Sequence, residues 1–196
     1  MGKLLEKIDS ELAAWISEQR LFFVATAPLA ATGHVNASPK GGDAFRVMGP
    51  LEVAYQDYTG SGAETVAHLQ ENGRIVIMFC SFEGPPRIVR LHGHGTVVTA
   101  RHSRFAELSS SFPVHAGTRA FIHVSVTRVS SSCGQAVPSF DFRANRDALD
   151  QWTARQDTKT LEAYRARKNQ RSIDGLPALA ESTGEVLPPE SQPQVS

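Results

Sequence analysis

The sequence predicts a mainly β protein in which antiparallel strands form a closed or nearly closed barrel with flanking helices. Short apolar runs separated by Gly and Pro recur between residues 21 and 130, as they do in strands joined by turns. The connections between these runs are mostly short, which makes most strand neighbours antiparallel. Helical patterns are too few to follow almost every strand, so a doubly wound parallel sheet is disfavoured.

The first 20 residues predict an amphipathic helix packed against an apolar surface. Apolar side chains recur there at helical spacing, with charged and polar residues between them: Leu4, Leu5, Ile8, Leu12, Trp15 and Ile16. We take residues 1–20 as an N-terminal helix ahead of the barrel.

Residues 21–140 are assigned to the barrel. Strands are predicted where apolar or alternating residues are bounded by turn residues, at 21–27, 34–38, 45–48, 51–55, 74–82, 87–100 and 121–130. The 39–43 segment, with two adjacent glycines, indicates a loop. Two helices interrupt the strands, one over 64–72 that ends at Gly73 and a short one over 103–110.

Two further segments follow the barrel. Residues 141–182 are predicted to be a C-terminal helical extension, with a charged helix over 145–167. Residues 183–196 are rich in Pro, Glu, Gln and Ser and contain no aromatic residue, a composition that predicts a disordered tail.

Charge and composition exclude several classes of partner. Twenty basic residues balance twenty acidic ones, so no global field draws the chain to nucleic acid or to an anionic membrane. No stretch approaches the roughly 18 apolar residues needed to span a bilayer, and charges interrupt the N-terminal residues too often for a signal peptide. With only two cysteines, a disulfide scaffold is also excluded. We therefore expect a cytoplasmic protein that binds neither nucleic acid nor membrane.

The most informative segment for chemistry is residues 57–65, which read DYTGSGAET. Glycines at a strand-to-helix turn leave backbone N–H groups free, and the helix dipole adds partial positive charge, so the turn suits a phosphate group. Two alternatives remain open. Ser61 and Glu64 have the spacing of a capping box, which would satisfy the same N–H groups internally. The glycine pattern also resembles a dinucleotide fingerprint, although its third glycine and the surrounding βαβ unit are missing.

Other candidate residues lie on a predicted strand and a predicted loop. Arg90, His92 and His94 share one face of the 87–100 strand. The two histidines could bind a metal ion, although such a site needs more than two ligands. Alternatively, they are ordinary surface or interface residues. Lys40 and Arg46 flank the glycine loop, so two cations could converge on one anion, or the loop could be a solvated connection.

Several segments together resemble the pyridoxamine 5′-phosphate oxidase-like flavoproteins, and in particular an uncharacterised branch of that superfamily. They are VNASPKGGDAFRV, AYQDYTGSGAETVAHLQENGRIVIMFC, GPPRIVRLHGHG and YRARKNQRSIDGLPAL, and they occur in the family's order over roughly residues 10–180. The resemblance implies a dimeric split barrel that binds FMN between its subunits. It thereby favours phosphate binding over helix capping at residues 57–65.

The resemblance also implies which residues contact the cofactor. Ser38 and Lys40 would lie near the ring or the phosphate, Arg46 along the flavin, and Arg87 and Arg90 would approach the ring from the partner subunit. The strand-to-helix turn would hold the phosphate through Asp57, Tyr58, Thr59, Ser61, Gly62, Ala63 and Thr65.

The sequence departs from the family at two places. Glu64, Thr65 and Val66 stand where family oxidases often carry a basic pair, so Glu64 must point away from the phosphate, or Lys40, Arg46 and backbone N–H groups must hold it. The segment that completes the pyridoxine-phosphate site has no clear match after Gly134. We therefore expect that pyridoxamine 5′-phosphate is not the substrate.

The expected function is an FMN-dependent oxidoreductase acting on an unknown small molecule, with the flavin carrying the hydride or electron chemistry. No metal site is expected, and the catalytic residues are not identified; Tyr58, His92 and Cys133 are the candidates. The alternatives are a flavin-binding carrier or sensor without turnover, and a related split barrel that binds haem or a deazaflavin.

Overall fold

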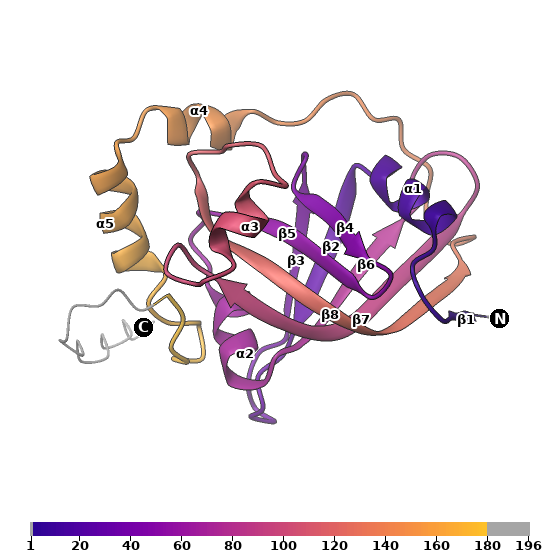
Figure 1. The fold of residues 1–196 in the computed structure, drawn as a ribbon, viewed down its shortest axis with the longest axis horizontal. Helices are drawn as coiled ribbons and strands as arrows, with labels where there is room; N and C mark the ends of the chain where they lie inside the picture. The colour runs from indigo at the N-terminus through magenta and orange to yellow at the C-terminus, as the bar shows by residue number, and fades with distance from the viewer. Residues whose placement is uncertain (1, 180–196) are drawn as a thin grey trace, which may run out of the picture.

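The computed structural model describes residues 2–179 of the chain, and within them the strands form one antiparallel sheet that curls into a half-barrel (Figure 1). The sheet order is β3-β2-β6-β7-β8-β5-β4, with β1 paired to the far end of β8. The strands are β1 (Lys3–Leu5), β2 (Leu21–Thr26), β3 (Asn36–Gly41), β4 (Phe45–Gly49), β5 (Glu52–Tyr58), β6 (Arg74–Cys80), β7 (Arg87–Val98) and β8 (Thr118–Cys133).

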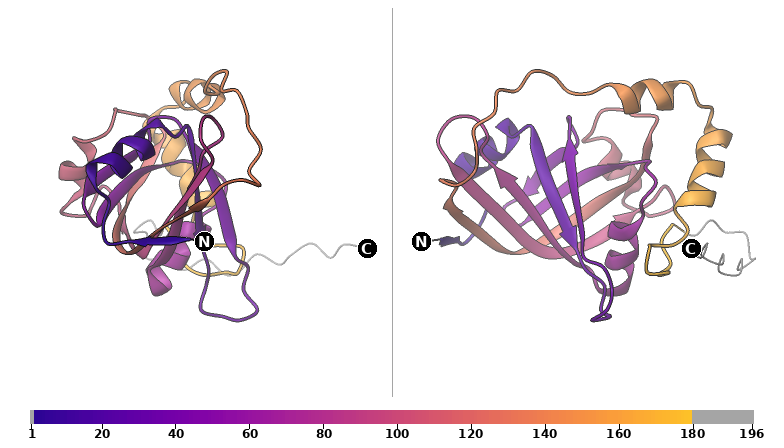
Figure 2. Two further views of the ribbon diagram at one scale, coloured as in Figure 1. Left: turned by 90° about the vertical axis from the view of Figure 1, so that its right-hand side faces the viewer. Right: turned by 180° about the vertical axis from the view of Figure 1, so that it is seen from behind.

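The two ends of the sheet, β3 and β4, follow one another in the chain but do not pair within residues 2–179. The sheet therefore curls without closing, which is the split form of the predicted antiparallel barrel (Figure 2). The fold class predicted from the sequence is confirmed.

The core fills the inside of this curl. Alternate residues of each strand point inward, as the period of a strand requires, and Phe22, Tyr55, Ile77 and Ile122 are among the buried side chains. One end is covered by helix α1 (Ser10–Glu18), which contributes Leu12 to the same core.

The remaining helices lie outside the sheet. Helix α2 (Glu64–Asn72) packs against β2 and β7, and its C-cap Gly73 has a left-handed φ of 70°, as predicted. After α3 (Phe105–Ser109) and β8, an extended arm over 134–147 leads to α4 (Ala148–Ala154) and α5 (Thr158–Lys168), as Figure 1 shows. Residues 169–179 then return to α2.

Most predicted strands differ from the observed ones by a few residues at their ends, and three regions differ more. The first helix begins at Ser10 because Asp9 caps it, its side chain accepting a hydrogen bond from Leu12 N; residues 3–5 form β1 instead. Pro39–Gly41, predicted as loop, belongs to β3, where proline is tolerated because β3 is an edge strand. The single helix predicted over 145–167 is two helices, the second capped by Asp157.

The predicted tail at 183–196 lies outside the described residues, as does the end of the predicted 141–182 extension. None of the helices within residues 2–179 is long and apolar enough to cross a membrane.

Gly93 and Gly95 of β7 lie where neighbouring parts of the fold approach the strand closely. A Cβ atom on Gly93 would collide with the Ser125 backbone at a bulge between β7 and β8, and one on Gly95 would lie 2.8 Å from Leu69 of α2. These glycines therefore allow the sheet to bend and α2 to pack closely.

Candidate functional site

A cavity of about 560 Å³ lies beside the open edge of the sheet, between the β3–β4 turn, the end of β5 and α4. We call it the polar cavity. Three of the residues predicted from the sequence to contact a cofactor line it: Lys40, Tyr58 and Thr59. Its remaining lining includes Gln56, His115, Arg146 and Asp150.

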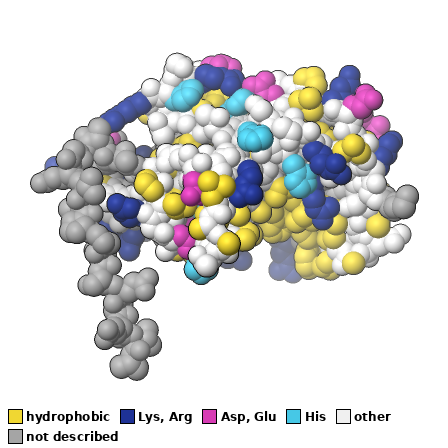
Figure 3. Space-filling model, turned by 90° about the horizontal axis from the view of Figure 1, so that it is seen from below, with side chains coloured by type: hydrophobic (Ala, Val, Ile, Leu, Met, Phe, Trp, Pro, Cys, Tyr) yellow, Lys and Arg dark blue, Asp and Glu magenta, His cyan; other side chains and the backbone are white. Residues whose placement is uncertain are grey.

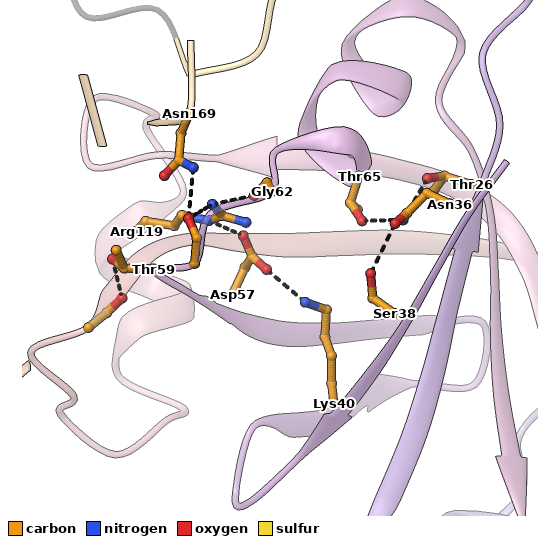
Figure 4. A network of polar contacts seen from close by, with 12 residues as sticks. Thr26, Asn36, Ser38, Lys40, Asp57, Thr59, Gly62, Thr65, Arg119 and Asn169 are labelled. Carbon is orange, nitrogen blue, oxygen red and sulfur yellow. Dashed lines mark hydrogen bonds and ion pairs between the residues drawn. The ribbon is translucent and has the colours of Figure 1, made fainter. Parts of the chain in front are cut away.

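A buried carboxylate lies between two cations next to this cavity (Figure 4). Asp57 is fully buried; Lys40 Nζ lies 3.0 Å from its Oδ1 and Arg119 Nε lies 2.7 Å from its Oδ2. Burial raises the pKa of this carboxyl, but the two cations outweigh it and hold the pKa below its ordinary value. Asp57 is therefore ionised at neutral pH and neutralises much of the charge that Lys40 would offer an anion.

Two carbonyl groups of the turn that was predicted to bind phosphate accept hydrogen bonds from side chains. Arg119 NH1 donates to the Gly62 carbonyl at 2.8 Å, and Asn169 Nδ2 donates to the Gly60 carbonyl at 2.8 Å. Among the hydrogen bonds of residues 2–179, none uses the backbone N–H groups of Gly60, Ser61, Gly62 or Ala63. This arrangement leaves the donors that an anion needs.

The capping box does not form. The N-cap of α2 is Ala63, without a side-chain cap, and Ser61 takes no part. Glu64 bends back over the turn, where its Oε2 would lie 2.5 Å from a Cβ atom on Gly62, while its Oε1 accepts from Ile173 N at 3.3 Å. A carboxylate thus lies beside the free N–H groups rather than pointing away from them.

Two more predicted residues, Ser38 and Thr65, are joined through Asn36 of β3 (Figure 4). Asn36 Nδ2 donates to Thr65 Oγ1 at 3.0 Å, and its Oδ1 accepts from Ser38 Oγ at 3.1 Å. Asn36 Nδ2 also donates to Thr26 Oγ1, which contacts Nδ1 of the buried His68 at 2.9 Å. This neutral network ties β3 to the start of α2.

Arg46 does not converge with Lys40. Its guanidinium makes a two-pronged contact with Asp43, at 2.6 and 2.9 Å, and donates from Nε to the Ser111 carbonyl. The guanidinium lowers the pKa of Asp43 and stacks 5.0 Å from the Phe112 ring centre.

Arg87 and Arg90 lie away from the polar cavity within one chain. They are on β7, which β2 and β6 separate from β3 in the sheet, and they donate to Ser131 Oγ and Ser132 Oγ. Of the three candidate catalytic residues only Tyr58 lines the polar cavity; His92 is on β7, and Cys133 is exposed at the end of β8.

Sequence reasoning missed three residues that give the polar cavity its fixed polar surface. Tyr58 donates to Gln56 Oε1 at 3.1 Å, and its ring packs 4.2 Å from that of His115. His115 Nδ1 accepts from Gly117 N, which leaves Nε2 to donate to Asp150 at 2.7 Å. Burial, followed by the nearby Asp150 and Asp43 carboxylates, raises the pKa of Tyr58, so this phenol remains a proton donor at neutral pH.

One of the missed residues had a sequence signal. Gln56 shares a strand face with Tyr58, since they are two residues apart on β5. His115 and Asp150 had none, because they come from a loop and a helix far apart in the chain.

The sequence and the fold both resemble known proteins. A family model described as pyridoxamine 5′-phosphate oxidase matches residues 8–133. The pyridoxamine 5′-phosphate oxidase family protein ustO of Aspergillus flavus is 39% identical over 191 residues, which cover 89% of this chain and 76% of that protein.

Two solved structures share the fold. A single-substitution variant of HupZ from Group A Streptococcus superposes with a TM-score of 0.50 at 23% identity, covering 64% of this chain and 99% of that one. A candidate pyridoxamine 5′-phosphate oxidase from Lactobacillus delbrueckii also has a TM-score of 0.50, at 17% identity, covering 65% of this chain and 98% of that one.

Proposed function

The chain belongs to the pyridoxamine 5′-phosphate oxidase family, and from this premise we propose that it binds FMN and is an oxidoreductase for a small molecule other than pyridoxamine 5′-phosphate. The family is associated with flavins. The flavin would supply the hydride or electron transfer, and the chain would bind it, orient it and set the charge around it.

The observation that carries the proposal is the turn from Gly60 to Ala63 at the start of α2. Its backbone N–H groups donate no hydrogen bond within the described residues, and they lie at the positive end of the helix dipole. Tyr58 and Thr59, just before the turn, line the polar cavity. A phosphate on the turn would leave the rest of the cofactor next to a cavity of suitable size.

Glu64 provides a sharp test, because its carboxylate lies beside the same N–H groups. If the turn binds phosphate, FMN binds more tightly than riboflavin, and Glu64→Gln strengthens FMN by about threefold to tenfold through loss of like-charge repulsion. Riboflavin affinity should not change. Titration by flavin fluorescence measures both.

The matched control is Glu71→Gln, the same change near the other end of the same helix, which should leave FMN affinity unchanged. Equal affinities for FMN and riboflavin in the parent protein would refute the phosphate assignment. The absorbance spectrum of the protein as purified would separately reveal haem or a deazaflavin.

We also propose a two-fold homodimer with the flavin between its subunits. The outer face of the sheet supports this, because Phe23 of β2 and Met78 of β6 lie there half-buried, opposite one another in the ladder, with Arg90 of β7 beside Met78. Figure 3 shows hydrophobic side chains gathered on one face of the molecule with basic and His side chains beside them. A second copy would cover such a face.

Light scattering at micromolar concentration should then give the dimer mass. Arg90→Ala should weaken flavin binding, whereas Arg74→Ala, on the exposed start of β6, should not. A flavin-loaded monomer would show that no second subunit is needed.

The charges of the polar cavity support a substrate other than pyridoxamine 5′-phosphate. Lys40 is paired with Asp57, and Asp43 and Asp150 offset Arg146 among the lining residues, so a second phosphate would find little net positive charge. Anaerobic mixing of flavin-loaded protein with millimolar pyridoxamine 5′-phosphate should therefore not bleach the flavin band. Rapid bleaching with formation of pyridoxal 5′-phosphate would make the protein a true oxidase.

A further inference from the structure

A second cavity, of about 710 Å³, lies between the end of α1, the start of β2, the β6–β7 connection and the arm over 134–147. Four aromatic side chains line it, and none belongs to the polar cavity: Trp15, Phe82, Phe140 and Phe142. We call it the aromatic cavity. Ligand sites of this size are usually lined by apolar and aromatic groups with a few polar ones.

The rings of this cavity are held in place before any ligand arrives. Phe82 and Phe140 stack with their centres 5.5 Å apart, and the Phe140 backbone N–H donates to the Phe82 carbonyl at 2.9 Å. Two residues along, Phe142 N donates to Glu83 Oε1 at 3.2 Å, and the Arg20 guanidinium lies 5.1 Å from the Phe142 ring centre. These contacts fix the arm over the cavity.

The arm rings nevertheless remain open to solvent. Phe140 is 57% exposed and Phe142 is 41% exposed. Both rings line the same cavity. Exposed rings gathered at one cavity are apolar surface that a bound molecule would remove from water.

Charges around the aromatic cavity are of both signs. Arg20 and Arg143 stand among its lining residues with Glu18, Glu83 and Asp141. This near balance favours neither an anion nor a cation, whereas the rings offer flat faces for stacking.

We propose that the aromatic cavity binds a neutral organic molecule with at least one planar ring, stacked on the side chains that the arm presents. The site needs neither flavin nor a second subunit. An experiment that refutes the proposed flavin binding would therefore leave this proposal untouched, and the reverse also holds. Phe140 is its central contact, because it stacks on the body of the protein through Phe82 and lies at the opening.

Trp15 makes the test direct, since the chain has only two tryptophans and the other, Trp152, packs on Tyr164. In the full-length Trp152→Phe protein, 2-naphthol should quench Trp15 fluorescence saturably, with the same dissociation constant whether or not flavin is bound. Phe140→Ala should raise that constant about fivefold or more, through loss of the stacking partner.

Two control variants separate stacking from general effects. Phe140→Leu keeps an apolar side chain but loses the ring, and should weaken binding nearly as much as Phe140→Ala. Leu29→Ala changes an exposed apolar residue outside the cavity and should leave the constant within twofold. A melting temperature unchanged by Phe140→Leu would show that the arm remains folded.

Three outcomes would overturn the proposal. The first is quenching that never saturates, and the second is a constant that Phe140→Ala and Phe140→Leu leave unchanged. The third is 2-naphthol affinity that falls as protein concentration rises, which would mean that a second copy of the chain fills the cavity.

Discussion

Two carboxylate–arginine contacts on neighbouring strands show how differently the same chemistry can be used. Asp57 of β5 is fully buried between Arg119 and Lys40, whereas the Asp43 side chain, at the β3–β4 turn, is 69% exposed beside Arg46. Lys40 and Arg46 were both predicted from sequence to contact the cofactor. Burial of the carboxylate separates the two pairs: the Asp57 pair is part of the structure around the polar cavity, whereas Asp43 lines that cavity with its side chain largely exposed.

The largest expected effect is at the buried pair. Asp57→Asn keeps the shape of the side chain but leaves Arg119, which is 6% exposed, and Lys40 without a counter-charge. Breaking a buried ion pair from one side costs about 3–5 kcal/mol, and we expect a loss near the lower end, about 3 kcal/mol, because Lys40 is partly solvated. Urea denaturation measures it, and a loss below about 1 kcal/mol would show that water already screens this pair.

The same carboxyl should dominate the acid dependence of stability. Its pKa in the folded protein lies below the unfolded value, which is about 3.9. The stability it contributes is therefore fully present above the unfolded pKa and is lost as pH falls through the folded pKa. Between pH 5 and 3 the parent should lose stability more steeply than Asp57→Asn; parallel curves for the two proteins would contradict this assignment.

A smaller loss of stability is expected from a substitution at Asn169, whose side chain, like that of Arg119, donates to a carbonyl group of the turn before α2. Asn169 is fully buried and its Nδ2 holds the Gly60 carbonyl, but its Oδ1 has no hydrogen-bond partner among the described residues. Asn169→Ala removes one hydrogen bond and one unsatisfied acceptor together, so we expect a loss of about 1 kcal/mol. Faster amide exchange at Thr59, whose N–H donates to the Gly117 carbonyl just before the turn, should accompany it, and unchanged exchange would mean that Arg119 alone orders the turn.

The exposed pair should matter least. Asp43→Asn should cost below about 1 kcal/mol, as is usual for surface ion pairs, and the small effect should shrink further in 1 M salt. A loss as large as that of Asp57→Asn would remove the distinction between the two pairs.

Much of the fold could be predicted from sequence because it depends on local patterns. The alternating strands, the short connections and the Gly73 helix end are each visible within a few residues. The adjacent glycines Gly41 and Gly42 misled the prediction, since β3 continues through Gly41 and the left-handed backbone begins only at Gly42.

The candidate site was predictable only in part, for a physical reason. Lys40, Tyr58 and Thr59 line the polar cavity as their motifs indicated. The partners that decide their charge are remote: Arg119 reaches Asp57 only through the register of β5 with β8, and Asn169 arrives from beyond α5. Periodicity carries no information about such long-range pairs.

The return of residues 169–179 to α2 has a consequence for the order in which the protein matures on the ribosome. When β8 has been synthesised the sheet is complete, yet Asn169, which holds Gly60, and Ile173, which holds Glu64, have not been made. The turn before α2 therefore acquires its final anchors last. A premature stop codon within α5 would leave a chain with every strand of the described sheet and an unanchored turn.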